Sequence, residues 1–141
     1  MAEAVFRSLA ARESLPVRIV ASSAGIRPTE VGGPPSELAV RCAARRGYDL
    51  RGHQVRALQL ADLSRFDQVL GLDRGHVAYL RDLAPANGRI ETLLHYAPNL
   101  DLEDVPDPWQ GAMADYDRAL DLIEAGCRGY LADLRRRHVS G

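Results

Sequence analysis

The chain contains 141 residues with a formal net charge of -1, and 46% of its residues are hydrophobic and 26% are charged. These values are typical of a globular protein, and we expect a single domain over residues 1–141. The near-zero charge excludes a protein-wide basic field that would attract nucleic acid or anionic lipid. The sequence has no run of about 18 apolar residues and no secretory signal pattern. We therefore expect a cytoplasmic protein that does not bind membranes.

The first half of the chain predicts helices that alternate with one strand. Apolar residues at helical spacing predict a helix over residues 1–12. The short, partly β-branched run VRIVASS predicts a buried strand over residues 17–23. A second helix is predicted over residues 35–46, with Gly47 as its stop signal. A short helical turn is predicted over residues 60–66.

The second half continues the alternation and ends in a long helix. Buried strands are predicted over residues 67–72 and 89–94, separated by a helix over residues 75–83. Residues 99–111 are rich in Asp and Pro and predict a loop. An amphipathic helix is predicted over residues 112–138. Its apolar stripe consists of Ala119, Leu122, Ile123, Cys127, Tyr130, Leu131 and Leu134.

Helices placed between short apolar strands predict an α/β fold with three layers, in which helices cover both faces of a small parallel sheet. Ligands bind at the carboxyl ends of the strands in such folds. The loops that follow the predicted strands should therefore line any site, and they carry Ser23, Asp73 and, further on, Asp107. No strand feeds the first helix, although a strand-to-helix loop is the usual place for phosphate binding.

Several motifs occur in the order typical of one enzyme family. They are MAEAVFR, SAG, EVGGPP, CAARRGYDLRGHQVRAL, FDQVLGLD, VPDPWQG and DLIEAGCRGYL. Together they cover essentially the whole chain, which resembles the low-molecular-weight protein tyrosine phosphatases. The resemblance implies a four-stranded parallel sheet and hydrolysis of phosphotyrosine proteins or small aryl phosphates through a phosphocysteine, with no cofactor or metal. It also leads us to expect a monomer or a weak homodimer.

In that family the MAEAVFR segment directly follows the first, central strand and the phosphate loop C-x5-R-[ST]-P. The resemblance therefore implies that this strand and loop should precede Met1, and that the 141 residues are an N-terminally truncated domain. They lack the nucleophilic cysteine and the phosphate-binding arginine. We expect the 141-residue chain to be inactive and a full-length product to be active.

The VPDPWQG block carries the residues expected nearest to the substrate. By resemblance, Asp107 is the general acid that protonates the leaving oxygen, although Asp before Pro is also a common turn pair. Trp109 and Gln110 match positions that flank the phenyl ring in the family. The indole of Trp109 can stack on an aryl group. Gln110 stands where the family usually has a second aromatic residue, so the resemblance does not supply a second aromatic contact to the phenyl ring.

Three further residues match supporting positions. Ser23 and His53 match residues that hydrogen-bond to the phosphate loop, although His53 is also readable as a surface loop histidine. Asp73 follows a predicted strand and faces the place where the loop arginine would lie. It is also a suitable N-cap for the helix over residues 75–83.

The two cysteines, Cys42 and Cys127, are poor candidates for a surrogate nucleophile. Both lie on apolar helical faces, and the residues six positions later are Tyr48 and Asp133 rather than Arg. Two alternative functions are also compatible with the sequence. One is a non-catalytic binding module derived from the phosphatase, and the other is an arsenate reductase on the same fold, which typically needs further cysteines.

Overall fold

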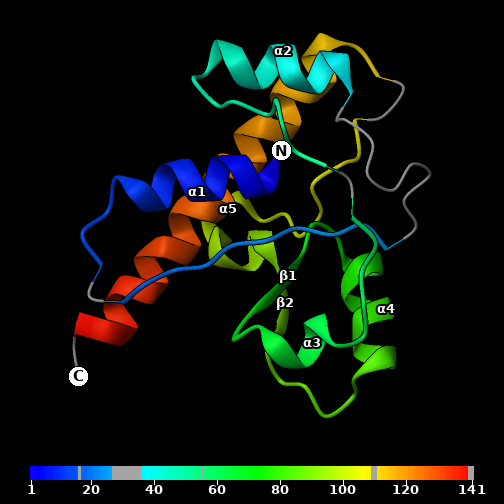
Figure 1. Ribbon diagram of the computed structural model, residues 1–141, viewed down its shortest axis with the longest axis vertical. Helices are drawn as coiled ribbons and strands as arrows, with labels where there is room; N and C mark the ends of the chain where they lie inside the picture. Colours follow the sequence, from blue (N-terminus) through cyan, green and yellow to red (C-terminus); the bar gives the residue numbers. More distant parts are fainter. Residues whose placement is uncertain (16, 27–35, 55, 109–110, 140–141) are drawn as a thin grey trace.

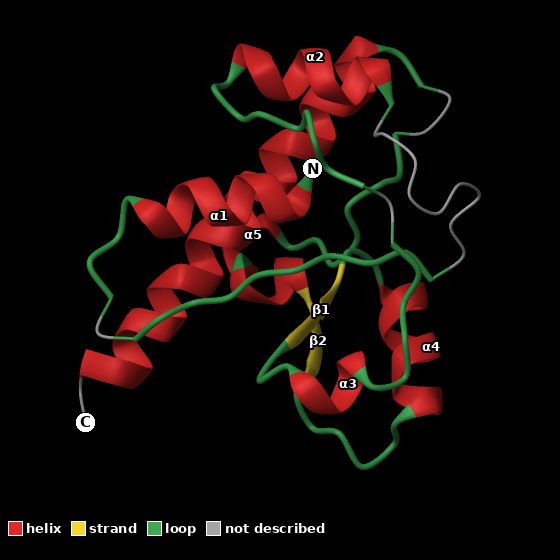
Figure 2. Cartoon of the chain, viewed as in Figure 1, coloured by secondary structure: helices red, strands yellow, loops and turns green. Residues whose placement is uncertain are grey.

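The computed structural model describes residues 1–15, 17–26, 36–54, 56–108 and 111–139. Within these ranges it has an α/β arrangement of helices around a short sheet (Figures 1 and 2). The elements in order are α1 (Ala2–Ala11), α2 (Glu37–Arg45), α3 (Asp62–Arg65), β1 (Val69–Gly71), α4 (Arg74–Leu83), β2 (Ile90–Thr92), the 3-10 helices η1 (Leu93–Tyr96) and η2 (Pro98–Leu100), and α5 (Met113–Val139). No helix in the described ranges is both long and apolar enough to cross a membrane.

The sheet consists of β1 and β2, which pair in parallel with Val69 opposite Ile90 and Gly71 opposite Thr92. Parallel pairing confirms the predicted sheet type, and both strands lie inside their predicted ranges. The prediction of a strand through residue 94 is wrong, because the chain turns into η1 after Thr92. Leu93 and Leu94 are both buried in η1, where they belong to the larger apolar cluster and pack against α5.

The strand predicted over residues 17–23 is also wrong. Residues 17–24 run across the molecule without forming a strand, and the nearby pairing is one isolated parallel bridge between Gly25 and Ala57. Val20 is 69% exposed, so its side chain lies outside the core. A strand requires a neighbouring chain for its hydrogen bonds, and along residues 17–24 the described chain supplies no backbone ladder.

Two apolar clusters lie against the strands. The larger cluster joins α1, α2 and α5 through residues such as Val5, Cys42 and Leu120, and the smaller one joins α3, α4 and β2. Within β1, Leu70 packs against the larger cluster and Val69 against the smaller one. Successive strand side chains point to opposite faces, so β1 separates the two clusters.

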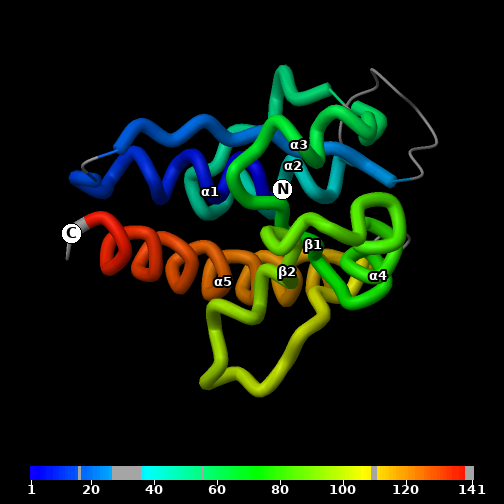
Figure 3. Tube along the Cα trace, turned by 90° about the horizontal axis from the view of Figure 1, so that it is seen from below, coloured from blue at the N-terminus to red at the C-terminus, as the bar shows by residue number. Residues whose placement is uncertain are grey.

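The long helix α5 provides most of the larger cluster. Every residue of its predicted apolar stripe is buried, and the fully buried Leu120 extends the stripe. α1 lies beside α5 (Figure 3), and η1 packs against α5 as well. At this last contact Gly126 faces the Leu93 side chain, and Gly129 faces the backbone carbonyl of Tyr96.

Helix α2 begins with a side-chain cap. The Ser36 hydroxyl accepts a hydrogen bond from the Ala39 N–H at 3.2 Å and lies 3.1 Å from the Tyr116 hydroxyl on α5. We expect Ser36→Ala to lower the free energy of unfolding by about 1 kcal/mol, measured by urea denaturation. The control is Ser64→Ala, whose exposed hydroxyl donates to the Ala61 carbonyl at 3.1 Å. An equal loss in both variants would contradict a capping role.

Asp62 makes stability depend on acid pH. Its carboxylate is buried, which raises its pKa, but the Gln59 N–H at 2.9 Å and the Arg56 guanidinium at 2.8 Å lower the pKa more, so that the net pKa lies below its ordinary value of 3.8. A depressed folded-state pKa stabilises the fold above the unfolded pKa, and this contribution is lost as the pH falls through the folded value. Below about pH 4 we expect the free energy of unfolding to fall less steeply with decreasing pH in Asp62→Asn than in the wild type. An equally steep fall in the two proteins would contradict the role of Asp62 in the acid dependence of stability.

Candidate active site

The loop that carries Asp107 is fixed to the carboxyl end of β1. The buried Val105 donates its N–H to the carbonyl of Leu72, the residue after β1, at 2.7 Å. One residue earlier, the Asp104 carboxylate accepts hydrogen bonds from the N–H of Arg74 at 2.9 Å and from its Nε at 3.2 Å. The start of α4 therefore holds the same loop. Asp107 lies at the edge of the sheet where a parallel α/β fold binds ligands.

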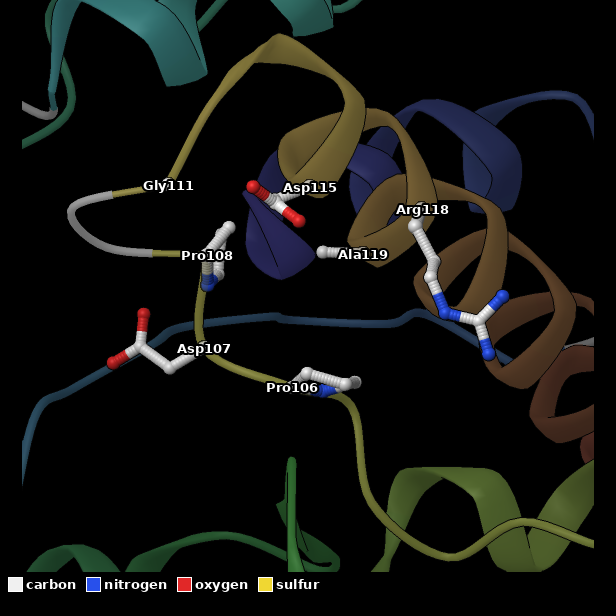
Figure 4. A pocket seen from close by; sticks show the side chains of 7 residues that line it. All are labelled: Pro106, Asp107, Pro108, Gly111, Asp115, Arg118 and Ala119. Carbon is white, nitrogen blue, oxygen red and sulfur yellow. The ribbon is translucent and has the colours of Figure 1, made fainter.

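Beyond these anchors, Asp107 lies on a cavity of about 200 Å³ between its loop and α5. Figure 4 shows the lining residues, which are Pro106, Asp107, Pro108, Gly111, Asp115, Arg118 and Ala119. Asp107 is exposed, and its carboxylate points away from Arg118 (Figure 4). An exposed carboxyl group on a loop can reach a substrate that approaches from solvent.

Gly111 fits a tight junction between this loop and α5. Its N–H donates to the Pro108 carbonyl at 2.7 Å. A Cβ at Gly111 would lie 2.6 Å from Oδ2 of Asp115 and 2.8 Å from the Pro108 carbonyl oxygen. The same Oδ2 accepts the Ala112 N–H at 2.8 Å, which satisfies a donor at the start of the helix. The glycine of the VPDPWQG block therefore allows the loop to turn directly into α5.

Asp73 caps α4, as predicted. Its Oδ1 accepts the His76 N–H at 2.7 Å, and the Nδ1 of the His76 ring lies 3.7 Å from the same oxygen. Asp73 caps α4, and the next residue, Arg74, binds the Asp104 carboxylate. The start of α4 therefore contacts both the loop that follows β1 and the loop that carries Asp107. The ion pair expected between Asp73 and a phosphate-loop arginine stays a prediction.

The structure brings Ser23 and His53 together at the first turn of α1, around Glu3. The Ser23 hydroxyl donates to Oε1 of Glu3 at 3.0 Å, and Nδ1 of His53 lies 3.8 Å from Oε2. Arg7, one turn later on α1, pairs with the same oxygen at 3.2 Å. Sequence reasoning missed Glu3. Its only sequence signal is an acidic residue in the first turn of a helix, where carboxylates are favoured.

Trp109 and Gln110 lie outside the described residues, so their expected contacts with a phenyl ring stay predictions. The remaining predicted residues fall into two groups. Asp73 and Asp107 belong to loops joined at the end of β1, whereas Ser23 and His53 meet on α1.

Both cysteines are buried, as predicted. Cys42 is fully buried beside Met113, with 3.5 Å between the two sulfur atoms, and Cys127 is 2% exposed. Burial raises the pKa of both thiols, and that of Cys127 rises to about 12. The thiolate is the nucleophilic form, so neither site favours attack on phosphate. Among the residues placed by the structure, no group of three or more His, Cys, Asp and Glu side chains could hold a metal ion.

Comparisons with known proteins give a consistent family. The model for "Low molecular weight phosphotyrosine protein phosphatase" matches residues 1–140. The low molecular weight protein-tyrosine-phosphatase YfkJ of Bacillus subtilis is 36% identical, covering 96% of this chain and 87% of the relative. A low molecular weight protein-tyrosine-phosphatase of Streptomyces coelicolor is also 36% identical, covering 97% of this chain and 86% of the relative.

Solved structures extend the similarity to the fold. The crystal structure of Bacillus subtilis YfkJ aligns with a TM-score of 0.88 at 35% identity, over 96% of this chain and 86% of that one. Vibrio vulnificus Wzb in complex with benzylphosphonate aligns with a TM-score of 0.78 at 24% identity, over 94% of this chain and 87% of that one, and it shares the fold. The chain therefore belongs to the low molecular weight phosphotyrosine protein phosphatase family.

Proposed function

We propose that the protein takes part in the hydrolysis of phosphotyrosine or other aryl phosphates, with Asp107 as the general acid. The observation that carries this proposal is the position of Asp107. It is an exposed carboxyl group on a loop anchored to the carboxyl end of β1, in a chain of the phosphatase family. In this role Asp107 protonates the phenolic oxygen as it leaves and then activates the water that releases phosphate.

The rest of the machinery requires a thiolate and an arginine. A cysteine at a strand-to-helix loop attacks phosphorus, because backbone N–H groups and a guanidinium lower its pKa and stabilise the transferring phosphoryl group. The 141 residues contain no Cys-x5-Arg sequence. Since Cys42 and Cys127 are buried and their pKa values are raised, we infer that these 141 residues alone do not hydrolyse aryl phosphates.

A second candidate is a non-catalytic binding module for a phosphorylated partner. This function needs only the loops around Asp107 and Asp73, which are joined at the end of β1, and no nucleophile. Arsenate reduction is disfavoured, because it would need further reactive thiols and both cysteines are buried.

The test combines intact mass with activity. The protein is purified from its own cells, weighed against the 15.5 kDa of the 141 residues, and assayed with p-nitrophenyl phosphate beside the 141-residue chain. We expect hydrolysis from a product that also carries a Cys-x5-Arg loop, and none from the 141 residues. A native mass of 15.5 kDa without hydrolysis would support the binding module. Hydrolysis by the 141 residues that is abolished in Cys42→Ser would overturn the inference about the nucleophile.

A further inference from the structure

A positively charged side chain lies on the cavity beside Asp107. Arg118 is an exposed residue in the second turn of α5 and lines the same 200 Å³ cavity as Asp107. Three other lining residues, Pro106, Pro108 and Ala119, offer apolar surface. The cavity thus combines apolar walls with one guanidinium and with the carboxylates of Asp107 and Asp115, of which Asp115 accepts the Ala112 N–H.

The acidic residues of α5 nearest to Arg118 in sequence have other partners. Asp115, three positions earlier, accepts the Ala112 N–H, and Asp117 and Asp121 pair with Arg46 of α2 at 3.6 and 2.8 Å. Residues three or four positions apart on a helix are the usual ion-pair partners, and for Arg118 the acidic ones on α5 are Asp115 and Asp121.

As a result, no carboxylate in the described ranges forms an ion pair with Arg118. Arg128, further along the same helix, pairs with Glu124 at 3.6 Å. Arg118 therefore differs from Arg128 both in its position on the cavity and in having no carboxylate partner among the residues that the structure describes.

We propose that Arg118 is a specificity-determining residue that binds the carboxylate of an acidic residue flanking the phosphotyrosine of the substrate. This inference rests on the proposed function, because it places the phosphotyrosine beside Asp107. A guanidinium matches a carboxylate in a bidentate geometry, and Pro106, Pro108 and Ala119 can contact the methylene groups of a glutamate. Asp107 carries a proton when it acts as the acid, which reduces its repulsion of that glutamate.

The experiment compares three phosphotyrosine peptides that differ only in one flanking residue, which is Glu, Gln or Lys. The wild-type protein from its own cells, Arg118→Ala and the matched control Arg128→Ala are assayed for KM and kcat. We expect the wild type and the control to prefer the Glu peptide over the Gln peptide about fivefold, mainly through KM. Arg118→Ala should lose this ratio. Raising the salt concentration should reduce it in the wild type, because the ion pair is screened.

Failure of this inference is separable from failure of the proposed function. If the wild type does not hydrolyse p-nitrophenyl phosphate, the proposed function fails, and the same peptides are titrated by calorimetry with phosphonomethyl-phenylalanine in place of phosphotyrosine. A Glu preference in binding that disappears in Arg118→Ala still supports the role of Arg118. The inference is overturned by equal affinity for the three peptides, by a preference for Lys, by no binding, or by a Glu preference that persists in Arg118→Ala.

Discussion

Gly129→Ala is expected to lower the free energy of unfolding by roughly 3 kcal/mol or more. A Cβ on Gly129 would lie 1.8 Å from the carbonyl oxygen of Tyr96 and 2.7 Å from its carbonyl carbon. These are backbone atoms of η1, so no side-chain rotation relieves the overlap. α5 and η1 would have to separate, which would open the cluster around the buried Leu93 and Leu94. A loss of this size is a large part of a typical stability of about 5–15 kcal/mol.

Urea denaturation followed by circular dichroism measures this loss. Gly88→Ala is the matched control, because a Cβ there meets no atom within 4 Å, and we expect it to change stability by less than about 0.5 kcal/mol. Gly126→Ala should fall between the two, since the atoms it meets belong to the Leu93 side chain and not to the backbone. A Gly129→Ala variant as stable as Gly88→Ala would show that the helix contact is looser than the structure has it.

Asp107→Asn is expected to reduce kcat on phenyl phosphate by about 10²–10³-fold in the catalytically active form of the protein. Asparagine has nearly the shape of aspartate but cannot give a proton to the leaving oxygen. The loss should depend on the leaving group, being largest for phenol and smaller for p-nitrophenol, which leaves without help from an acid. Steady-state rates on a series of aryl phosphates measure this dependence.

The matched control for this prediction is Asp101→Asn in the same acidic loop. Asp101 is exposed and has a left-handed backbone with φ 52°, a conformation that asparagine adopts readily. We expect its activity to remain close to that of the wild type. An equal loss on all leaving groups in Asp107→Asn, or a similar loss in Asp101→Asn, would mean that the loop has been displaced and that a proton donor has not been removed.

The elements that could be predicted from the sequence are those fixed by local interactions. The helical stripe of α5 and the Asp73 cap depend on residues within a few turns of each other, and both are confirmed. The strand over residues 17–23 has the local composition of a strand, but strand formation depends on a neighbouring chain that local composition does not report. The end of β2 was missed for a related reason, because η1 forms where Leu93 and Leu94 pack together against α5.

The candidate site divides in the same way. Asp107 and Asp73 were identified because short motifs mark them, whereas Glu3 was missed because its contact with Ser23 spans 20 residues of sequence. Arg118 has no motif at all. Its proposed role depends on the cavity that it lines and on the pairing of Asp117 and Asp121 with Arg46. Both are tertiary contacts, which a linear sequence does not report.

The extended run of residues 17–24 has a practical consequence for handling the protein. An extended segment with apolar side chains at the surface is a template on which another copy can add a strand. Val20, with 69% of its surface exposed, lies in the middle of that segment. We therefore expect a charged residue in place of Val20 to raise the concentration at which the protein stays in solution.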